Sequence, residues 1–325
     1  MVAISVTIPV YNAERYLRQA VESALGQTGV AQAILADDGS TDGSLALAHQ
    51  LAAEDPRVEV VRHPDGANHG VGATRNLTLQ AVRFPWVAFL DADNYFEAGA
   101  FDFLMAHLRA HPDLDGTFAN VRIFTEASFD SSLGRSFDGV STTMSTTLPP
   151  EALFRALVLR SHKAFSMNTL LVRYSALARA GVFSPNLRVG EDSALLLKLT
   201  AVGRLAAADL ERVVVTQRWH GANLLGGRQV SAAQKYRNRL AAYEQVWDWG
   251  QASPEPPQQQ LLLWRIVQDK LRLGELEEQP AARVRRAIRA WLRERCPYPE
   301  HRQQARAWLT YGAPPPAPPQ LSERA

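Results

Sequence analysis

The segment ISVTIPVYN, residues 4–12, decides the fold of this chain. It is a run rich in β-branched residues that ends in two polar side chains, a pattern typical of a strand that leads into a loop. Similar runs follow at residues 33–36, 58–61 and 86–90. Apolar residues at helical spacing separate them, over residues 14–25, 44–53 and 73–82. This βαβαβαβ alternation predicts an α/β fold with a mostly parallel central sheet flanked by helices.

The second half of the chain changes in character. Residues 151–159 and 191–202 have helical periodicity, and residues 212–217 resemble a strand. Between them and the first half, residues 124–147 are rich in Ser, Thr and Gly, which predicts a mobile connection or an acceptor loop. After about Ser231 the pattern is helical, with breaks at residues 253–257 and at Pro280. We therefore expect three parts: a catalytic domain over residues 1–229, a helical region over 230–311 and a flexible Pro-rich tail over 312–325.

Composition narrows the classes of protein to consider. The chain has 325 residues, of which 46% are hydrophobic and 21% charged, the balance of a globular protein. Its net charge of +2 gives no general reason to expect a nucleic-acid partner. The single cysteine, Cys296, excludes an intrachain disulfide and a zinc site with several Cys ligands, which suits a reducing cytoplasm. We expect no membrane-spanning segment, because no apolar run approaches about 20 residues. We also expect no signal peptide, because residues 1–10 have neither a basic start nor a long apolar run.

In a parallel sheet, ligands gather beyond the carboxyl ends of the strands. The first predicted strand, residues 4–10, leads into Tyr11 and Asn12, and the second leads into the turn DDGSTD, residues 37–42. An Asp at such a position can accept hydrogen bonds from a nucleobase or a ribose. The alternative is local, because Ser40 or Thr41 can simply cap the following helix.

The segment NHGVGATRN, residues 68–76, is a glycine-bearing turn that opens a helix. It lacks the third glycine of a dinucleotide fingerprint and does not follow the first strand, which argues against a Rossmann dehydrogenase. Arg75 can reach a diphosphate or support neighbouring carboxylates, and a structural salt bridge is an equal alternative.

Two acidic motifs complete the set. Asp91 and Asp93 flank Ala92 directly after the strand at residues 86–90, which places both carboxylates on one side of an extended chain. Carboxylate oxygens together with substrate phosphates suit Mg²⁺ or Mn²⁺, whereas the alternative is a solvated turn. Asp192 stands at the start of the helix 191–202, where a carboxylate can also be a helix cap.

Taken in order, these motifs resemble the inverting family-2 glycosyltransferases with the GT-A fold, a Rossmann-like sheet flanked by helices. The resemblance covers roughly residues 3–223 and rests on VTIPVYN at 6–12, DDGSTD at 37–42, GVGATRN at 70–76, DAD at 91–93 and ED at 191–192. It implies that Tyr11 and Asp38 bind uridine and that Asp91 lies near the ribose. The expected nucleotide-sugar-binding residues are Pro9, Tyr11, Asp38, Arg75, Asp91 and Glu191.

The same resemblance implies the chemistry. Asp93 is the expected metal ligand for Mn²⁺ or Mg²⁺, and Asp192 is the expected catalytic base. His220 can ligate the metal or contact the diphosphate, and a buried structural histidine is an equal alternative. Asn94 departs from the family, because many members have another Asp there, so an additional acidic contact to the donor is in question.

The implied activity is metal-dependent, inverting transfer of a hexosyl or N-acetylhexosaminyl group from a nucleotide-sugar, expected to be a UDP-sugar. Residues 1–95 would then form the nucleotide-sugar half, and residues 96–229 would form the acceptor half. Acceptors to consider are a cell-envelope glycan, another polymer, a lipid-linked glycan and a peptide. An alternative is a catalytically inactive nucleotide-sugar-binding or scaffold protein. A nucleotidyltransferase is disfavoured, because residues 11–16 hold no glycine-rich, Lys-containing loop.

Residues 281–295 form a basic amphipathic pattern with six arginines and a stripe of apolar residues. One interpretation is a helix that packs on the rest of the chain or on a second copy, with a solvated arginine face. The other is docking to anionic lipid or to an anionic polymer, which would place the protein at the inner face of a membrane. The sequence alone does not separate the two.

Overall fold

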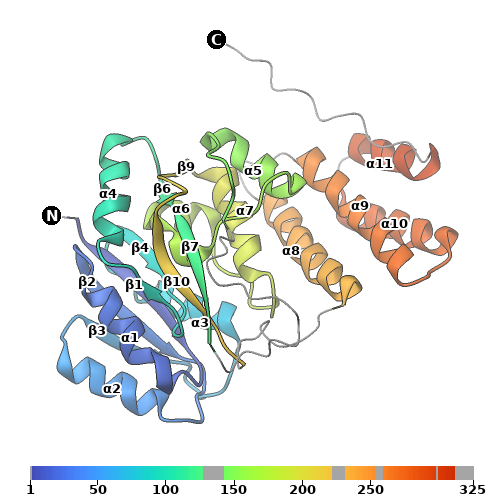
Figure 1. Cartoon of the computed structure of the whole chain (residues 1–325). Coiled ribbons are helices and arrows are strands. Elements are labelled where there is room, and N and C mark those ends of the chain that lie inside the picture. Colours follow the sequence, from blue (N-terminus) through green and yellow to red (C-terminus); the bar gives the residue numbers. More distant parts are fainter. Residues whose placement is uncertain (1, 127–142, 222–230, 253–258, 298, 312–325) are drawn as a thin grey trace. The chain divides into compact units, whose positions relative to one another are not determined.

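The structure, a computed structural model, describes residues 2–126, 143–221, 231–252, 259–297 and 299–311. The chain divides into two units, Met1–Gln229 and Val230–Ala325. Figure 1 labels their elements. The first unit contains, in chain order, β1 (Ile4–Val10), α1 (Glu14–Leu25), β2 (Val30–Asp37), α2 (Ser44–Glu54), β3 (Val58–Arg62), α3 (Val71–Gln80), β4 (Trp86–Phe89), β5 (Tyr95–Phe96), α4 (Ala100–Ala110), β6 (Gly116–Phe118), β7 (Asn120–Thr125), α5 (Pro150–Leu159), the 3₁₀-helix η2 (Met167–Thr169), β8 (Leu171–Arg173), α6 (Tyr174–Ala180), α7 (Glu191–Val202), β9 (Leu205–Ala207) and β10 (Val213–Trp219).

The strand order of the central sheet places the ends of β1 and β4 side by side. Seven strands run in the order β3-β2-β1-β4-β8-β6-β9. β1 is parallel to both β2 and β4, whereas β8 is antiparallel to β4 and to β6. The chain builds outward from β1 to β3 and then returns to the other side of β1 as β4. Such a reversal is where α/β sheets bind ligands, beyond the carboxyl ends of the strands.

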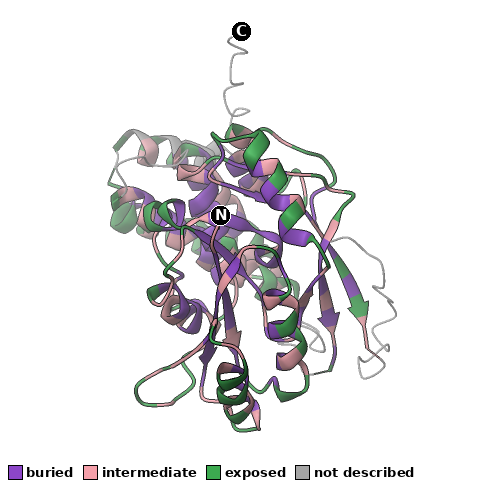
Figure 2. Cartoon of the chain, turned by 90° about the vertical axis from the view of Figure 1, so that its left-hand side faces the viewer, coloured by how far each residue is buried: buried purple, intermediate pink, exposed green. Residues whose placement is uncertain are grey.

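Both faces of this sheet are covered by apolar packing. On β4, Trp86 and Ala88 belong to a core cluster with α1 and α4, whereas Val87 and Phe89 belong to a second cluster with α6 and α7. This alternation is the two-residue period of a strand buried on both faces. Figure 2 shows buried residues, in purple, along the strands and exposed residues, in green, mainly on helices and loops. The mixed sheet with helices on both sides confirms the predicted fold class.

The structure also contains a smaller, three-stranded sheet that the sequence did not predict. It has the order β5-β10-β7, with β10 parallel to β7 and antiparallel to β5. The strand predicted at residues 212–217 is present as β10 and extends to Trp219. Residues 124 and 125, which we expected to begin a loop, belong to β7. Residues 127–142 of that loop lie outside the described residues.

The second unit is helical, as predicted. It contains α8 (Ala232–Ala252), α9 (Gln259–Leu276), α10 (Ala281–Arg295) and α11 (Pro299–Tyr311). Pro280 directly precedes α10, where its missing N–H costs no helical hydrogen bond. The expected break at 253–257 and the expected tail at 312–325 lie outside the described residues. Among the described helices, none has both the length and the apolar character needed to cross a bilayer.

Candidate functional site

The first strand separates from β4 just before it ends. The paired register stops at Thr7 and Phe89, and the amide of Leu90 donates the last hydrogen bond to Thr7 O at 3.0 Å. Pro9 has no N–H to donate to β4, so the ladder does not continue past this bond. Pro9 is half-buried, and Tyr11, two residues on, is 52% exposed. Both predicted donor-binding residues therefore lie at the open end of this strand pair.

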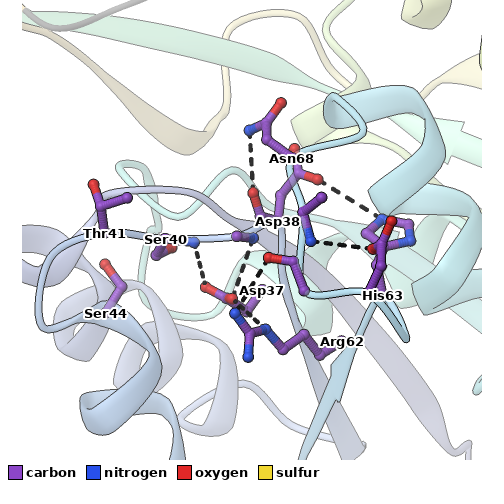
Figure 3. A network of polar contacts seen from close by, with 12 residues as sticks. Asp37, Asp38, Ser40, Thr41, Ser44, Arg62, His63 and Asn68 are labelled. Carbon is purple, nitrogen blue, oxygen red and sulfur yellow. Dashed lines mark hydrogen bonds and ion pairs between the residues drawn. The ribbon is translucent and has the colours of Figure 1, made fainter.

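The two aspartates at the carboxyl end of β2, Asp37 and Asp38, have different partners (Figure 3). Asp37 accepts from the amides of Gly39 and Ser40 at 3.2 Å each and pairs with Arg62 at 3.3 Å. Its carboxylate therefore holds the turn. Gly39 completes that turn with φ +74°, and a Cβ there would lie 2.9 Å from the backbone of Ala67.

Asp38 joins this turn to the start of α3. Its carboxylate accepts from the amide of His69 at 2.8 Å and from that of Gly70 at 3.0 Å, and His63 Nε2 lies 3.7 Å away. Asn68 also donates its side-chain amide to the carbonyl of Asp38. Asp38 is thus buried and held in a fixed orientation, directly beside the turn that opens α3.

Arg75 on α3 connects the two acidic motifs. It is buried, and it donates to Asp91 Oδ1 at 2.6 Å and to Glu191 Oε1 at 2.9 Å. Burial lowers the pKa of Arg75, but the charges of Asp91, Glu191 and Asp192 outweigh it, and the pKa lies above its ordinary value. The structure thus shows Arg75 in salt bridges that support the neighbouring carboxylates, and its contact with a diphosphate stays a prediction.

The orientation of Asp91 is set by a residue that sequence reasoning missed. Asn168 in η2 donates its side-chain amide to Asp91 Oδ2 at 2.9 Å and accepts the amide N–H of Asp91 at 2.7 Å. Asn168 is buried and lies in a short 3₁₀ turn. A single Asn with no motif around it carries no signal that could have identified it in the sequence.

Asp93 and His220 lie together. Asp93 Oδ2 and His220 Nε2 are 3.3 Å apart, and the imidazole is buried and stacks on Tyr16 with 4.7 Å between ring centroids. Burial and the charge of Asp91 raise the pKa of Asp93, whereas its hydrogen bond to His220 opposes that rise. A buried carboxylate of this kind favours a cation in its neighbourhood.

The pair fits the expected divalent cation. It offers a carboxylate oxygen and an imidazole nitrogen, both ligands that Mn²⁺ accepts. In the parts of the chain that the structure describes, no group of three or more His, Cys, Asp or Glu residues could hold a metal ion. A cation that binds with a nucleoside diphosphate needs only one or two protein ligands, because phosphate oxygens and water complete its shell.

Asn94, the departure from the family pattern, has a structural role. It is buried, and its Oδ1 accepts the amide N–H of Arg218 on β10 at 2.9 Å. Arg218 returns a contact by donating to the carbonyl of Asp93 at 2.8 Å. Together these bonds fasten the turn after β4 to the small sheet that carries His220.

Glu191 and Asp192 begin α7, next to Arg75. Burial, followed by the charge of Asp192, raises the pKa of Glu191 to about 7, although Arg75 opposes the shift. Asp192 is half-buried, and its Oδ1 accepts the amide N–H of Ser193 at 2.6 Å. The helix start is close to α3, because a Cβ on Gly72 would lie 3.5 Å from Cγ of Glu191.

The predicted acidic residues therefore occupy one neighbourhood. Asp38 binds the backbone at the start of α3, and Arg75 on α3 bridges Asp91 and Glu191. Asp93 follows Asp91 by two residues, and Asp192 follows Glu191 by one. Side-chain contacts join Arg75, Asp91 and Glu191, whereas Asp38 is connected to this group through α3 and Asp93 through the turn after β4.

The chain is similar in sequence to known glycosyltransferases. The chain is 32% identical to EpsH of Bacillus subtilis (strain 168) over 173 residues, 53% of this chain and 47% of that protein. It is 34% identical to the chondroitin synthase of Pasteurella multocida (strain Pm70) over 98 residues, 30% of this chain and 10% of that protein. These matches span less than half the length of the curated relatives.

A structural comparison shows the same fold. The crystal structure of S. aureus TarS 1-349 in complex with UDP-GlcNAc superposes with a TM-score of 0.61 at 17% identity, covering 95% of this chain and 92% of that one. At sequence level, the family model described as glycosyl transferase family 2 matches residues 5–167. That segment includes β1, the DDGSTD turn, α3 and the two aspartates after β4. The chain belongs to glycosyl transferase family 2.

Proposed function

We propose that this chain transfers a sugar from a UDP-sugar to an acceptor hydroxyl with inversion of the anomeric centre, assisted by Mn²⁺ or Mg²⁺. The observation that carries the proposal is the pairing of the buried Arg75 with Asp91 and Glu191 beyond the carboxyl end of β4 in a family-2 domain. Solved complexes of TarS with UDP and with UDP-GlcNAc support a UDP-sugar as the donor class.

In this proposal residues 1–95 hold the donor, and Asn168 and His220 from the second half of the domain complete its site. Tyr11, exposed beside Pro9, and the oriented carboxylate of Asp38 bind the nucleoside, and Asp91 accepts from the ribose. Asp93 and His220 would hold the cation, which when bound neutralises the charge of the departing diphosphate. Arg75 and Asn168 keep Asp91 in the orientation that the ribose requires.

Residues 96–229 supply the acceptor side. Inverting displacement at an anomeric carbon requires a base on the face opposite the leaving group. Asp192 is half-buried at the N-terminus of α7, and it takes the proton of the acceptor hydroxyl. Relatives named chondroitin synthase and succinoglycan biosynthesis protein ExoO support a glycan or polymer as the acceptor.

The decisive experiment replaces Asp192 by Asn and measures UDP release from a panel of UDP-sugars with Mn²⁺. Loss of a general base should slow turnover about 10²- to 10⁴-fold. UDP binding, measured by calorimetry, should remain. Asp209→Asn is the matched control, because Asp209 is exposed and likewise accepts a backbone N–H, that of Glu211 at 2.8 Å.

The outcomes separate the alternatives. An unaltered rate in Asp192→Asn would remove Asp192 from the role of base. A wild-type chain that binds UDP-sugars but releases no UDP with any of them would instead be the inactive binding or scaffold protein. The departure from the family pattern at Asn94 does not by itself favour that alternative, because Asn94 accepts the amide N–H of Arg218.

A further inference from the structure

The second unit carries a concentrated positive charge that the proposed reaction does not use. Residues 230–325 contain 15 Lys and Arg against 10 Asp and Glu, whereas the whole chain has a net charge of only +2. Six of these cations lie on the 15 residues of α10. The charge of the chain is therefore distributed unevenly, with its densest positive segment on one helix.

The structure separates the two faces of α10. Val284, Ile288 and Leu292 are buried, and α10 packs against α9 and α11 within the second unit, as expected for an amphipathic helix that packs by its apolar stripe. The arginines point elsewhere and are exposed: Arg283, Arg285, Arg286, Arg289, Arg293 and Arg295. The apolar stripe is thus occupied and is not available for insertion into a bilayer.

Most of these arginines lack an acidic partner. Arg295 pairs with Asp248 at 2.5 Å. Among the residues that the structure describes, the other five arginines of α10 form no ion pair. Arginines three and four positions apart repel one another on a helix surface, so this arrangement costs stability within the chain. An external anion would remove that cost.

The geometry favours a flat partner. At 3.6 residues per turn, Arg285, Arg286, Arg289 and Arg293 fall within an arc of about 100° and extend over about 12 Å of helix. All four are exposed, so their long side chains can reach a flat surface together. We propose that this arginine face of α10 docks the protein on an anionic lipid bilayer by charge alone, without apolar insertion.

The test uses the full chain and vesicles. Wild type should sediment with vesicles of 70% phosphatidylcholine and 30% phosphatidylglycerol, but not with phosphatidylcholine alone, and 0.5 M NaCl should release it completely. Replacing the four arginines 285, 286, 289 and 293 by Gln should lower the affinity about 10²- to 10³-fold. Replacing the same four by Lys keeps the charge and should keep the affinity within about threefold.

A control for net charge removes four exposed arginines elsewhere, Arg83, Arg122, Arg179 and Arg204, by replacement with Gln. This variant should bind the anionic vesicles like wild type. Circular dichroism establishes that each variant is folded. Three results would each overturn the proposal: binding to neutral vesicles, full binding by the α10 Gln variant, or binding of soluble polyphosphate without any binding of anionic vesicles. If the Gln variant does not fold, the proposal is still tested by two measurements: the release of wild type by 0.5 M NaCl and the affinity of the Lys variant for the anionic vesicles.

Discussion

Replacing Glu191 by Gln should stabilise the first unit above neutral pH. Three carboxylates, Asp91, Glu191 and Asp192, lie around the single guanidinium of Arg75, so the fully ionised cluster has two negative charges in excess. Of the three carboxylates, Glu191 is the one whose ionised form is destabilised, because burial and the charge of Asp192 raise its pKa to about 7. Gln removes that charge, and Arg75 keeps its bond to Asp91, so no buried cation is left alone.

The size and sign of the effect follow from proton linkage. A folded-state pKa of about 7 against an unfolded value of 4.5 means that the folded chain binds more protons between these pH values. Stability is therefore lost as the pH rises through this window, and the loss amounts to about 3 kcal/mol above pH 7. Below pH 4.5 the carboxyl is neutral in both states, and Gln and Glu should be nearly equivalent.

The assay is a urea titration at pH 4.5 and pH 8.5, with pulse hydrogen–deuterium labelling of peptides from β1 and β4. The local readout is needed because a chain of two units need not unfold in one step. Glu191→Gln should gain about 2–3 kcal/mol over wild type at pH 8.5 relative to pH 4.5. Glu151→Gln is the control, since Glu151 is exposed in the first turn of α5. A variant less stable than wild type at pH 8.5 would refute the reasoning and show that the ionised carboxylate is net stabilising.

Two further predictions concern neighbouring contacts. Asn76→Ala removes a two-bond clamp, since Asn76 both donates to and accepts from the backbone of Phe183 at 2.9 Å. It should cost about 2–3 kcal/mol in the same urea assay, and a cost near zero would show that water replaces both bonds. Asp93→Asn removes the carboxylate of the proposed cation pair, so Mn²⁺ should no longer raise the affinity for UDP measured by calorimetry. An undiminished effect of Mn²⁺ would assign the cation to other ligands.

The helices and strands that were predicted well are those whose own sequence has a clear helical or strand periodicity. The helices at 14–25 and 191–202 have the predicted bounds, and β1 matches the predicted strand at 4–10. These segments follow the periodicity of their own side chains, which is set by neighbours a few residues away. The short strands β5, β6, β8 and β9 have two or three residues each and were not predicted. So few residues hold no detectable period, and only their pairing partners make them strands.

The same division applies to the candidate site. The sequence by itself determined the order of strands and helices and the acidic residues that follow them, because strand ends and turns are encoded locally. Only the tertiary structure decided that Arg75 turns toward Glu191, 116 residues away, that Asn168 orients Asp91, and that Asn94 faces β10. Such contacts depend on which segments the packed sheet brings together, and a one-dimensional pattern does not contain that information.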